Sequence, residues 1–263
     1  MKTALIQLQV GKNAEANLKK AVYCVEEAAK SKAGFVLLPE LFLGGIEKSI
    51  DNTLALTYQS ALKTLQKMAK KRKIFLLAGS AIERVQGINK FYNTAILFSP
   101  QGKITAKYRK INLFKACLGE KSIQENKFYF PGDKAAQAKV DNFLVGLAIC
   151  YDLRFPVLFR KYCEKGVHII SLPSNFTQNT GEAHWEVLLR ARAIENQCYI
   201  LAPNQVGESG NGIMSYGNSM IVDPWGTILA RASGDKEEII YADILLARIK
   251  EAQRLLPGIR KKV

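Results

Sequence analysis

Short apolar runs alternate with amphipathic segments along almost the whole 263-residue chain. The runs are continuously apolar rather than alternating with polar residues, which is typical of strands covered on both faces of a sheet. The segment 14–32 instead carries apolar residues at helical spacing, at Leu18, Ala21, Val22 and Val25. This alternation predicts a layered α/β fold with a sheet at its centre.

The pattern can be divided into expected elements. We expect strands at 3–10, 34–38, 74–81, 143–150, 167–173, 199–203 and 239–244. We expect helices at 14–32, 54–73, 156–165, 183–198 and 245–256. Hairpins are expected at 91–107 and 220–232, turning at 100–103 and 223–226. No internal repeat, low-complexity linker or change of composition interrupts the pattern, so we expect one domain over residues 1–263.

Composition narrows the class of protein. No apolar run approaches the roughly 20 residues that a membrane-spanning helix needs. The first segment, MKTALIQLQVGK, lacks a long hydrophobic region and a small-residue cleavage site, so it suits a buried strand better than a signal peptide. Five cysteines without paired spacing do not make a disulfide framework. We therefore expect a cytoplasmic protein without membrane contact.

The net charge and the two histidines bear on two possible functions, nucleic-acid binding and zinc binding. The net charge of +15 would suit a nucleic-acid partner, but the basic residues are spread over 19–20, 70–73, 107–110 and 260–262. No aromatic–basic interleaving or recognition motif accompanies them, so we expect a solvated, lysine-rich surface. His168 and His184 are far apart and no CxxC is present, which disfavours a zinc site.

Three ionisable residues stand where predicted strands end: Glu40 in VLLPE, Lys110 in KYRK and Cys150 in VGLAIC. Strand ends in α/β folds often meet at one edge of the sheet, where sites form. A thiol needs a nearby cation or base to become a nucleophile, and a lysine and a glutamate are such groups. Each residue alone has a simpler interpretation, as a water-facing glutamate, a solvated lysine or a small core cysteine. His168 is expected as a core histidine, and nothing marks His184 as a base.

The sequences around these residues resemble the nitrilase, or carbon–nitrogen hydrolase, superfamily. The matching stretches are LLPELF, YRKINLF and GLAICYDLRFP, with a further glutamate, Glu125, in QENKFYFPGD. The resemblance continues through HWEVLLRARAIENQCYI and SYGNSMIVDPWGTILA. It implies an α/β four-layer αββα sandwich and a homodimer or higher homo-oligomer, with 156–165 and 183–197 as candidate contacts.

The resemblance also implies a reaction. The family hydrolyses non-peptide C–N bonds through a thioester, with Cys150 as nucleophile and Glu40 as the group that moves protons. Lys110 is then the fixed positive charge beside the oxyanion, the backbone N–H of Tyr151 a second donor, and Glu125 the residue that holds Lys110 or the substrate. No metal and no organic cofactor are implied.

The substrate is less closely specified. The sequence is most similar to the branch of deaminated glutathione amidases and omega-amidases, which act on small amides bearing a carboxylate and release ammonia. It departs from that branch at LFLGGIEKS and at LPGIRKKV. Hydrolysis of N-carbamoyl amino acids or amines, and of nitriles, are alternatives within the family. A basic nucleic-acid-binding protein is the alternative from another class.

Residues near the cysteine have open assignments. Arg154 either presents its guanidinium to a substrate carboxylate or pairs with a buried acid such as Glu195. Asn175, in the stretch SNF, is expected in the pocket wall and in substrate binding. Asp152 is expected to anchor the loop after the strand, and Glu195 with Asn196 to brace it.

Overall fold

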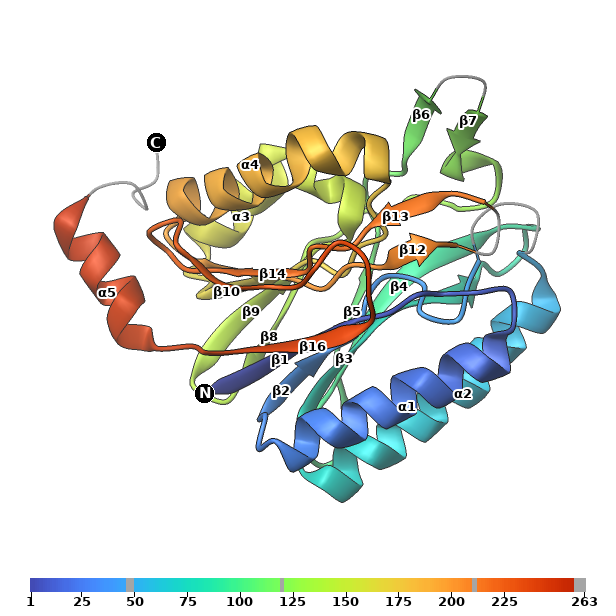
Figure 1. The fold of residues 1–263 in the computed structure, drawn as a ribbon, viewed down its shortest axis with the longest axis horizontal. Helices are drawn as coiled ribbons and strands as arrows, with labels where there is room; N and C mark the ends of the chain where they lie inside the picture. Colours follow the sequence, from blue (N-terminus) through green and yellow to red (C-terminus); the bar gives the residue numbers. More distant parts are fainter. Residues whose placement is uncertain (46–49, 119–120, 210–211, 258–263) are drawn as a thin grey trace.

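Two six-stranded sheets lie face to face in the computed structural model, which describes residues 1–45, 50–118, 121–209 and 212–257. A pair of helices covers the outer face of each sheet (Figure 1). Apolar residues of both sheets, among them Leu5, Leu37, Val145 and Ile169, share one buried core between the layers. The fold is therefore the four-layer αββα sandwich that the family resemblance implies.

The first sheet has the order β16–β1–β2–β3–β4–β5. Its strands are β1 (Lys2–Gln7), β2 (Phe35–Leu37), β3 (Phe75–Arg84), β4 (Phe91–Phe98), β5 (Ile104–Arg109) and β16 (Glu238–Asp243). Helices α1 (Ala14–Lys30) and α2 (Asn52–Arg72) cover its outer face (Figure 1). Alternate side chains of β1 face opposite layers, since Leu5 packs between the sheets while Ala4 and Ile6 pack with the helices.

The second sheet has the order β15–β14–β11–β10–β9–β8. Its strands are β8 (Ala136–Val140), β9 (Phe143–Leu147), β10 (Ile169–Ser171), β11 (Tyr199–Ala202), β14 (Met220–Val222) and β15 (Ile228–Arg231). Helices α3 (Pro156–Glu164) and α4 (Gln178–Asn196) form the outer layer, and α5 (Leu246–Leu255) follows the last strand (Figure 1). Trp185 and Leu189 of α4 are fully buried in the core.

Two short hairpins extend from the sandwich on the same side (Figure 1). They are β6 (Lys115–Leu118) with β7 (Lys121–Gln124), and β12 (Val206–Glu208) with β13 (Met214–Tyr216). Two short 3₁₀ helices, η2 (Glu125–Lys127) and η3 (Cys150–Arg154), contain four predicted site residues: Glu125 in η2, and Cys150, Tyr151 and Arg154 in η3. The sequence patterns predict neither hairpin, nor strand β8.

Four predicted boundaries are wrong by three residues or more. Two of them are in the first sheet, where β1 ends at Gln7 rather than residue 10 and β3 extends to Arg84 rather than residue 81. The strand expected to reach residue 150 ends at Leu147, and Cys150 opens η3. The helix expected to start at residue 183 starts at Gln178. The sequence does not predict its first turn because the segment before Ala183 is polar and contains a glycine. A Cβ at Gly181 would lie 2.2 Å from the Tyr216 ring, so this glycine permits close packing rather than ending the helix.

Some predictions concern residues outside the described part of the chain: 46–49 in LFLGGIEKS, 258–263 in LPGIRKKV and, within these, the basic cluster 260–262. Within the described ranges, no helix combines the length and apolar character needed to cross a membrane.

Candidate active site

Three of the predicted site residues meet in a buried ion-pair cluster. Lys110 Nζ lies 2.9 Å from Glu40 Oε1 and 2.9 Å from Glu125 Oε1. The side chains of Lys110 and Glu40 are only 1% and 3% exposed, so water does not screen their charges. Burial alone would lower the pKa of Lys110, but the charges of Glu125 and Glu40 outweigh it and hold that pKa well above its usual value. Lys110 is therefore a permanent cation.

Glu40 is held in place by a strained turn after β2. The next residue, Leu41, has a positive φ of 46°, and its N–H donates to Ser80 Oγ at 3.0 Å. Gln205 Nε2 donates to the Glu40 backbone carbonyl at 2.7 Å. A left-handed conformation at leucine costs free energy, which the surrounding hydrogen bonds and packing offset. The turn therefore fixes where the Glu40 carboxylate lies.

Both carboxylate oxygens of Glu40 accept hydrogen bonds. Oε1 accepts from Asn93 Nδ2 at 2.8 Å as well as from Lys110, and Oε2 accepts from the backbone N–H of Asn175 at 2.9 Å. Sequence reasoning missed Asn93. Its only signal is a polar residue inside the apolar strand FYNTAILF of β4, where it is 1% exposed. These three donors fix the orientation of the carboxylate.

Glu125 lies at the start of η2 and is held from two sides. Its Oε1 accepts from Lys110, and its Oε2 accepts from the backbone N–H of Phe114 at 2.7 Å. Burial raises the pKa of the Glu125 carboxyl, while the charge of Lys110 acts in the opposite direction. Of the two roles considered from the sequence, the contact with Lys110 is the one the structure contains.

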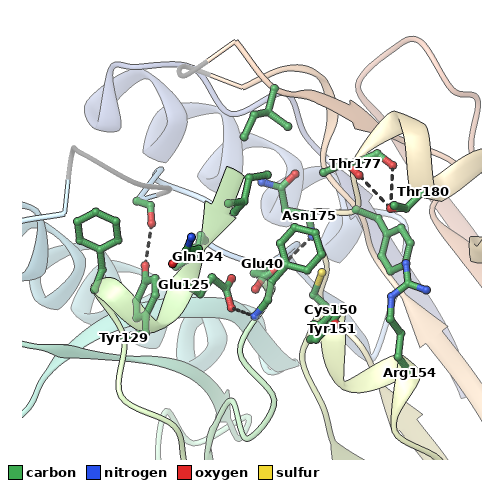
Figure 2. A pocket seen from close by; sticks show the side chains of 17 residues that line it. Glu40, Gln124, Glu125, Tyr129, Cys150, Tyr151, Arg154, Asn175, Thr177 and Thr180 are labelled. Atoms are coloured by element: carbon green, nitrogen blue, oxygen red, sulfur yellow. Dashed lines mark hydrogen bonds between the residues drawn. The ribbon is translucent and has the colours of Figure 1, made fainter. Parts of the chain in front are cut away.

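Cys150 lies in the same pocket as Glu40 and Glu125 (Figure 2). It has a positive φ of 44°, and its N–H donates to the Pro173 carbonyl at 3.0 Å. Burial, followed by the charge of Glu40, raises the pKa of its thiol well above the usual value, although Lys110 opposes this. The resting residue is therefore a thiol rather than a thiolate, and it needs a base to become a nucleophile.

Asp152 anchors the loop that presents the cysteine. It is fully buried and accepts hydrogen bonds from the Ile149 N–H, from the Asn112 side chain and from the Tyr108 hydroxyl. Burial raises the pKa of its carboxyl, and these donors counteract the shift. The expected structural role of Asp152 is confirmed by these contacts.

The pocket above the cysteine has a cavity volume of about 690 Å³ including the space at its open mouth. Tyr151, Arg154 and Asn175, all predicted as substrate-binding residues, line it (Figure 2). The Tyr151 ring packs edge-on against Phe114 and Phe155. The Asn175 side chain accepts from Ser215 Oγ at 2.6 Å, while its backbone N–H orients Glu40.

Further lining residues come from segments that the sequence patterns do not single out. They are Ile123 and Gln124 of β7, Phe128 and Tyr129 after η2, Thr177 and Thr180 at the start of α4, and Ile213 beside β13.

Arg154 does not pair with Glu195, so that alternative is wrong. Glu195 is exposed and binds Arg192 Nη1 at 2.9 Å, while Arg192 Nε donates to the Leu153 carbonyl at 3.0 Å. Arg192 braces the loop directly, Glu195 binds that arginine, and Asn196 Nδ2 donates to the Arg192 carbonyl and to Glu195 Oε1. Arg154 contacts His184 in the first half of α4, whereas Glu195 lies near the C-terminal end of that helix.

His168 lies directly before β10 and is half-buried, rather than in the core as expected. Its Nδ1 accepts the backbone N–H of Leu144 at 2.9 Å, so it is a satisfied structural histidine.

A thiol and a hydrogen-bonded carboxylate line one cavity, and a permanent cation lies against that carboxylate. Such a set can supply a nucleophile, a group that accepts and returns protons, and a charge that stabilises an oxyanion.

Comparisons with known proteins identify the family of the chain and related folds. The family model for carbon–nitrogen hydrolases matches residues 2–254. Omega-amidase NIT2 of Mus musculus is 38% identical over 262 residues, covering 98% of this chain and 94% of that protein. Deaminated glutathione amidase of Synechocystis sp. is 36% identical over 266 residues, covering 99% and 97%. The crystal structure of Saccharomyces cerevisiae Nit3, a member of branch 10 of the nitrilase superfamily, superposes with a TM-score of 0.86 at 32% identity, covering 98% of this chain and 94% of that one.

Proposed function

The chain belongs to the carbon–nitrogen hydrolase family and is a hydrolase of non-peptide C–N bonds, and on this premise we propose how its residues act and on which amide. The proposed substrate is a small amide bearing a carboxylate, of the 2-oxoglutaramate or deaminated glutathione type. The observation that supports it is a pocket containing Cys150 and Glu40 together with Arg154, for which no ion pair is found within the described part of the chain.

Acylation begins at Cys150. Its sulfur attacks the amide carbonyl carbon while Glu40 accepts the thiol proton. The carbonyl oxygen then carries negative charge. Lys110 uses two of its three ammonium N–H groups on Glu40 and Glu125, which leaves the third for this oxygen. The backbone N–H of Tyr151 is the second proposed donor, and losing one such donor typically costs on the order of 3 kcal/mol.

Collapse of the tetrahedral intermediate breaks the C–N bond. Glu40 returns its proton to the leaving nitrogen, ammonia departs, and the acyl group stays on Cys150 as a thioester. Glu40 then accepts a proton from water, whose oxygen attacks the thioester carbon. When the C–S bond breaks, Glu40 returns this proton to the sulfur, which releases the carboxylic acid and regenerates the Cys150 thiol and the Glu40 carboxylate. Glu125 keeps Lys110 in position throughout, because its carboxylate accepts a hydrogen bond from the ammonium in addition to the one that Glu40 accepts.

The distal carboxylate is assigned to Arg154. A guanidinium binds a carboxylate through two parallel N–H groups, which gives directional recognition as well as charge. The Arg154 guanidinium carbon lies 5.1 Å from the Phe176 ring centroid, and both residues line the pocket. Asn175 contributes to binding through the wall it forms beside Cys150.

A substrate panel tests the proposal. Ammonia release is measured from 2-oxoglutaramate, deaminated glutathione, N-carbamoyl amino acids, simple nitriles and 4-oxopentanamide, which has a methyl group where 2-oxoglutaramate has its carboxylate. The expected result is the highest kcat/KM on the two carboxylate-bearing amides. Preference for carbamoyl compounds or nitriles, or no turnover of either keto-acid amide, would contradict the substrate assignment.

We also propose that the chain acts as a single domain in a cytoplasmic homodimer. Within the described part of the chain, Cys24, Cys150, Cys163 and Cys198 form no disulfide, which suits a reducing compartment. Val157 of α3 and Val187 of α4 are 64% and 66% exposed on the outer helical layer, where the predicted contacts lie. Sedimentation should give twice the chain mass of 29.3 kDa, and Val187→Glu should shift the protein towards monomer. A monomeric wild type would contradict the dimer.

A further inference from the structure

Arg154 has a neighbour that the mechanism does not use. Both terminal nitrogens of its guanidinium, Nη1 and Nη2, lie 3.3 Å from Nδ1 of His184 on α4. A guanidinium has no acceptor, so the imidazole nitrogen must accept, and the ring must then carry its proton on Nε2. His184 thus holds Arg154 from the side of the outer helical layer.

We infer that His184 is a positioning residue for the Arg154 guanidinium and that it sets the preference of the enzyme for carboxylate-bearing amides. The inference rests on the proposed function, since it assumes that Arg154 binds the substrate carboxylate. His184 does not line the pocket, whereas Thr180, one helical turn before it, does. Its effect on substrate therefore passes through Arg154.

The geometry of the fork explains how one histidine can position it. A guanidinium offers two edges for paired N–H bonds, one formed by Nη1 and Nη2 and one formed by Nε and Nη2. The single acceptor Nδ1 bridges the first edge and so fixes the rotation of the fork within its plane. No described hydrogen bond uses Nε of Arg154, so the second edge is the one presented to a carboxylate.

The rings around the fork limit its remaining freedom. The guanidinium carbon lies 5.1 Å from the Phe176 ring centroid and 5.8 Å from that of Tyr151. These aromatic contacts add cation–π attraction but leave rotation about the side-chain axis possible. Without the acceptor at His184, a half-buried arginine with no carboxylate partner in the described part of the chain would spread over several rotamers. Binding a carboxylate would then require ordering it first.

His184 is well suited to substitution. It is exposed, and its neighbour Trp185, not His184, fills the core. His184→Phe keeps a ring of similar size and removes the acceptor. His184→Asn places an amide oxygen one bond from Cγ, as Nδ1 is, and is the matched control that restores an acceptor.

The test is a double-mutant cycle measured on two substrates. Selectivity is the ratio of kcat/KM for 2-oxoglutaramate to kcat/KM for 4-oxopentanamide. We expect His184→Phe to lower this ratio about 3- to 10-fold, the range of one hydrogen bond to a charged group, mainly through KM for the acid. His184→Asn should keep the ratio within about twofold of wild type. In an Arg154→Leu background, His184→Phe should change the ratio by less than about twofold, since the shared interaction is already gone.

Other outcomes separate the inference from the proposed function. An unchanged or increased ratio in His184→Phe, with a large loss in Arg154→Leu, overturns the inference alone. An equal loss from His184→Phe with and without Arg154 overturns it too, because the effect would not pass through that arginine. If Arg154→Leu leaves the ratio unchanged, the assignment of the carboxylate to Arg154 is wrong, and the inference falls with it.

Discussion

Cys150 is a buried thiol, and neighbouring charges shift its pKa in opposite directions. Burial and the charge of Glu40 raise the pKa of the thiol, and Lys110 lowers it less than these raise it. An enzyme that depends on a standing thiolate would need the opposite balance. The proton must therefore leave the sulfur during the attack, which is the task proposed for Glu40.

A titration of the thiol tests this balance. In wild type, the ultraviolet absorbance of a Cys150 thiolate should be absent up to about pH 9, the ordinary pKa of a thiol, because the pKa lies well above it. Glu40→Gln removes a negative charge that raises this pKa, so its thiolate should form at lower pH although turnover is lost. Cys150→Ala is the reference that subtracts the other thiols and the tyrosines. A thiolate already present at neutral pH in wild type would contradict the account.

Sequence patterns nominate single residues well where each has its own recognisable setting. Each of four residues lies in or beside a short sequence motif: Glu40, Lys110, Glu125 and Cys150. The structure places three of them in the lining of one pocket and joins Lys110 to Glu40 and Glu125 by ion pairs.

Residues whose function depends only on three-dimensional placement give no such signal. Asn93 is an unremarkable polar residue in a strand until the fold places it against Glu40. The Arg154–Glu195 pairing fails for a similar reason. Glu195 shares a helix face with His184 but lies eleven residues, or about 16 Å, further along α4.

Strand β3 contains the irregularity that makes room for the turn carrying Glu40. The register between β3 and β4 shifts between Leu77 and Ser80, and Gly79 within this bulge has a φ of 56°. A Cβ at Gly79 would lie 1.9 Å from the Pro39 carbonyl oxygen. The bulge thus lets the backbone of β3 pass directly beneath the residue that precedes Glu40.

Gly79→Ala should therefore be severe. The clash with the Pro39 backbone and the left-handed conformation together should lower the free energy of unfolding by more than about 3 kcal/mol. The turnover of the folded fraction should also fall, because Glu40 moves with Pro39. Gly87→Ala is the matched control: Gly87 has a φ of 81° but open space around its Cβ position, so about 1–2 kcal/mol is expected with normal turnover. Chemical denaturation and ammonia release measure both, and equal effects at the two glycines would contradict the explanation.

Elements with a strong apolar pattern could be predicted from the sequence, including the short buried strands β2 and β10, and short strands at the edges of the fold could not. The helices α1 and α2 differ from their predicted bounds by two residues or fewer at each end. Strands β6, β8 and β12, with sequences KACL, AQAKV and VGE, have no apolar run, so only their partner strands define them. Two of these short strands, β6 and β12, belong to hairpins beside the pocket. The rim of the pocket is therefore the part of the site that the sequence predicts least well.

At the scale of the whole molecule, the net charge of +15 has a functional consequence. A positive field attracts anions over a distance set by the Debye length, about 30 Å in 0.01 M salt and about 3 Å in 1 M. An anionic substrate should therefore gain in association from the surface charge, and a neutral amide should not.

Ionic strength tests this. Raising NaCl from about 20 mM to about 500 mM should lower kcat/KM for 2-oxoglutaramate severalfold, while kcat/KM for 4-oxopentanamide stays within about twofold. Equal salt dependence for both substrates would show that the field of the protein does not assist capture of the anion.

The central claim is that Cys150 carries the acyl group during amide hydrolysis. Ammonia release from 2-oxoglutaramate, measured for wild type and for Cys150→Ala at equal enzyme concentration, tests it most directly. Cys24→Ala, which alters a half-buried thiol on α1 in the outer layer, is the control and should retain wild-type turnover. The wild type should turn over the substrate, and Cys150→Ala should lose at least about 10⁴-fold in turnover. A loss of this size is typical when a covalent nucleophile is removed. Turnover in Cys150→Ala within about tenfold of wild type would contradict this claim.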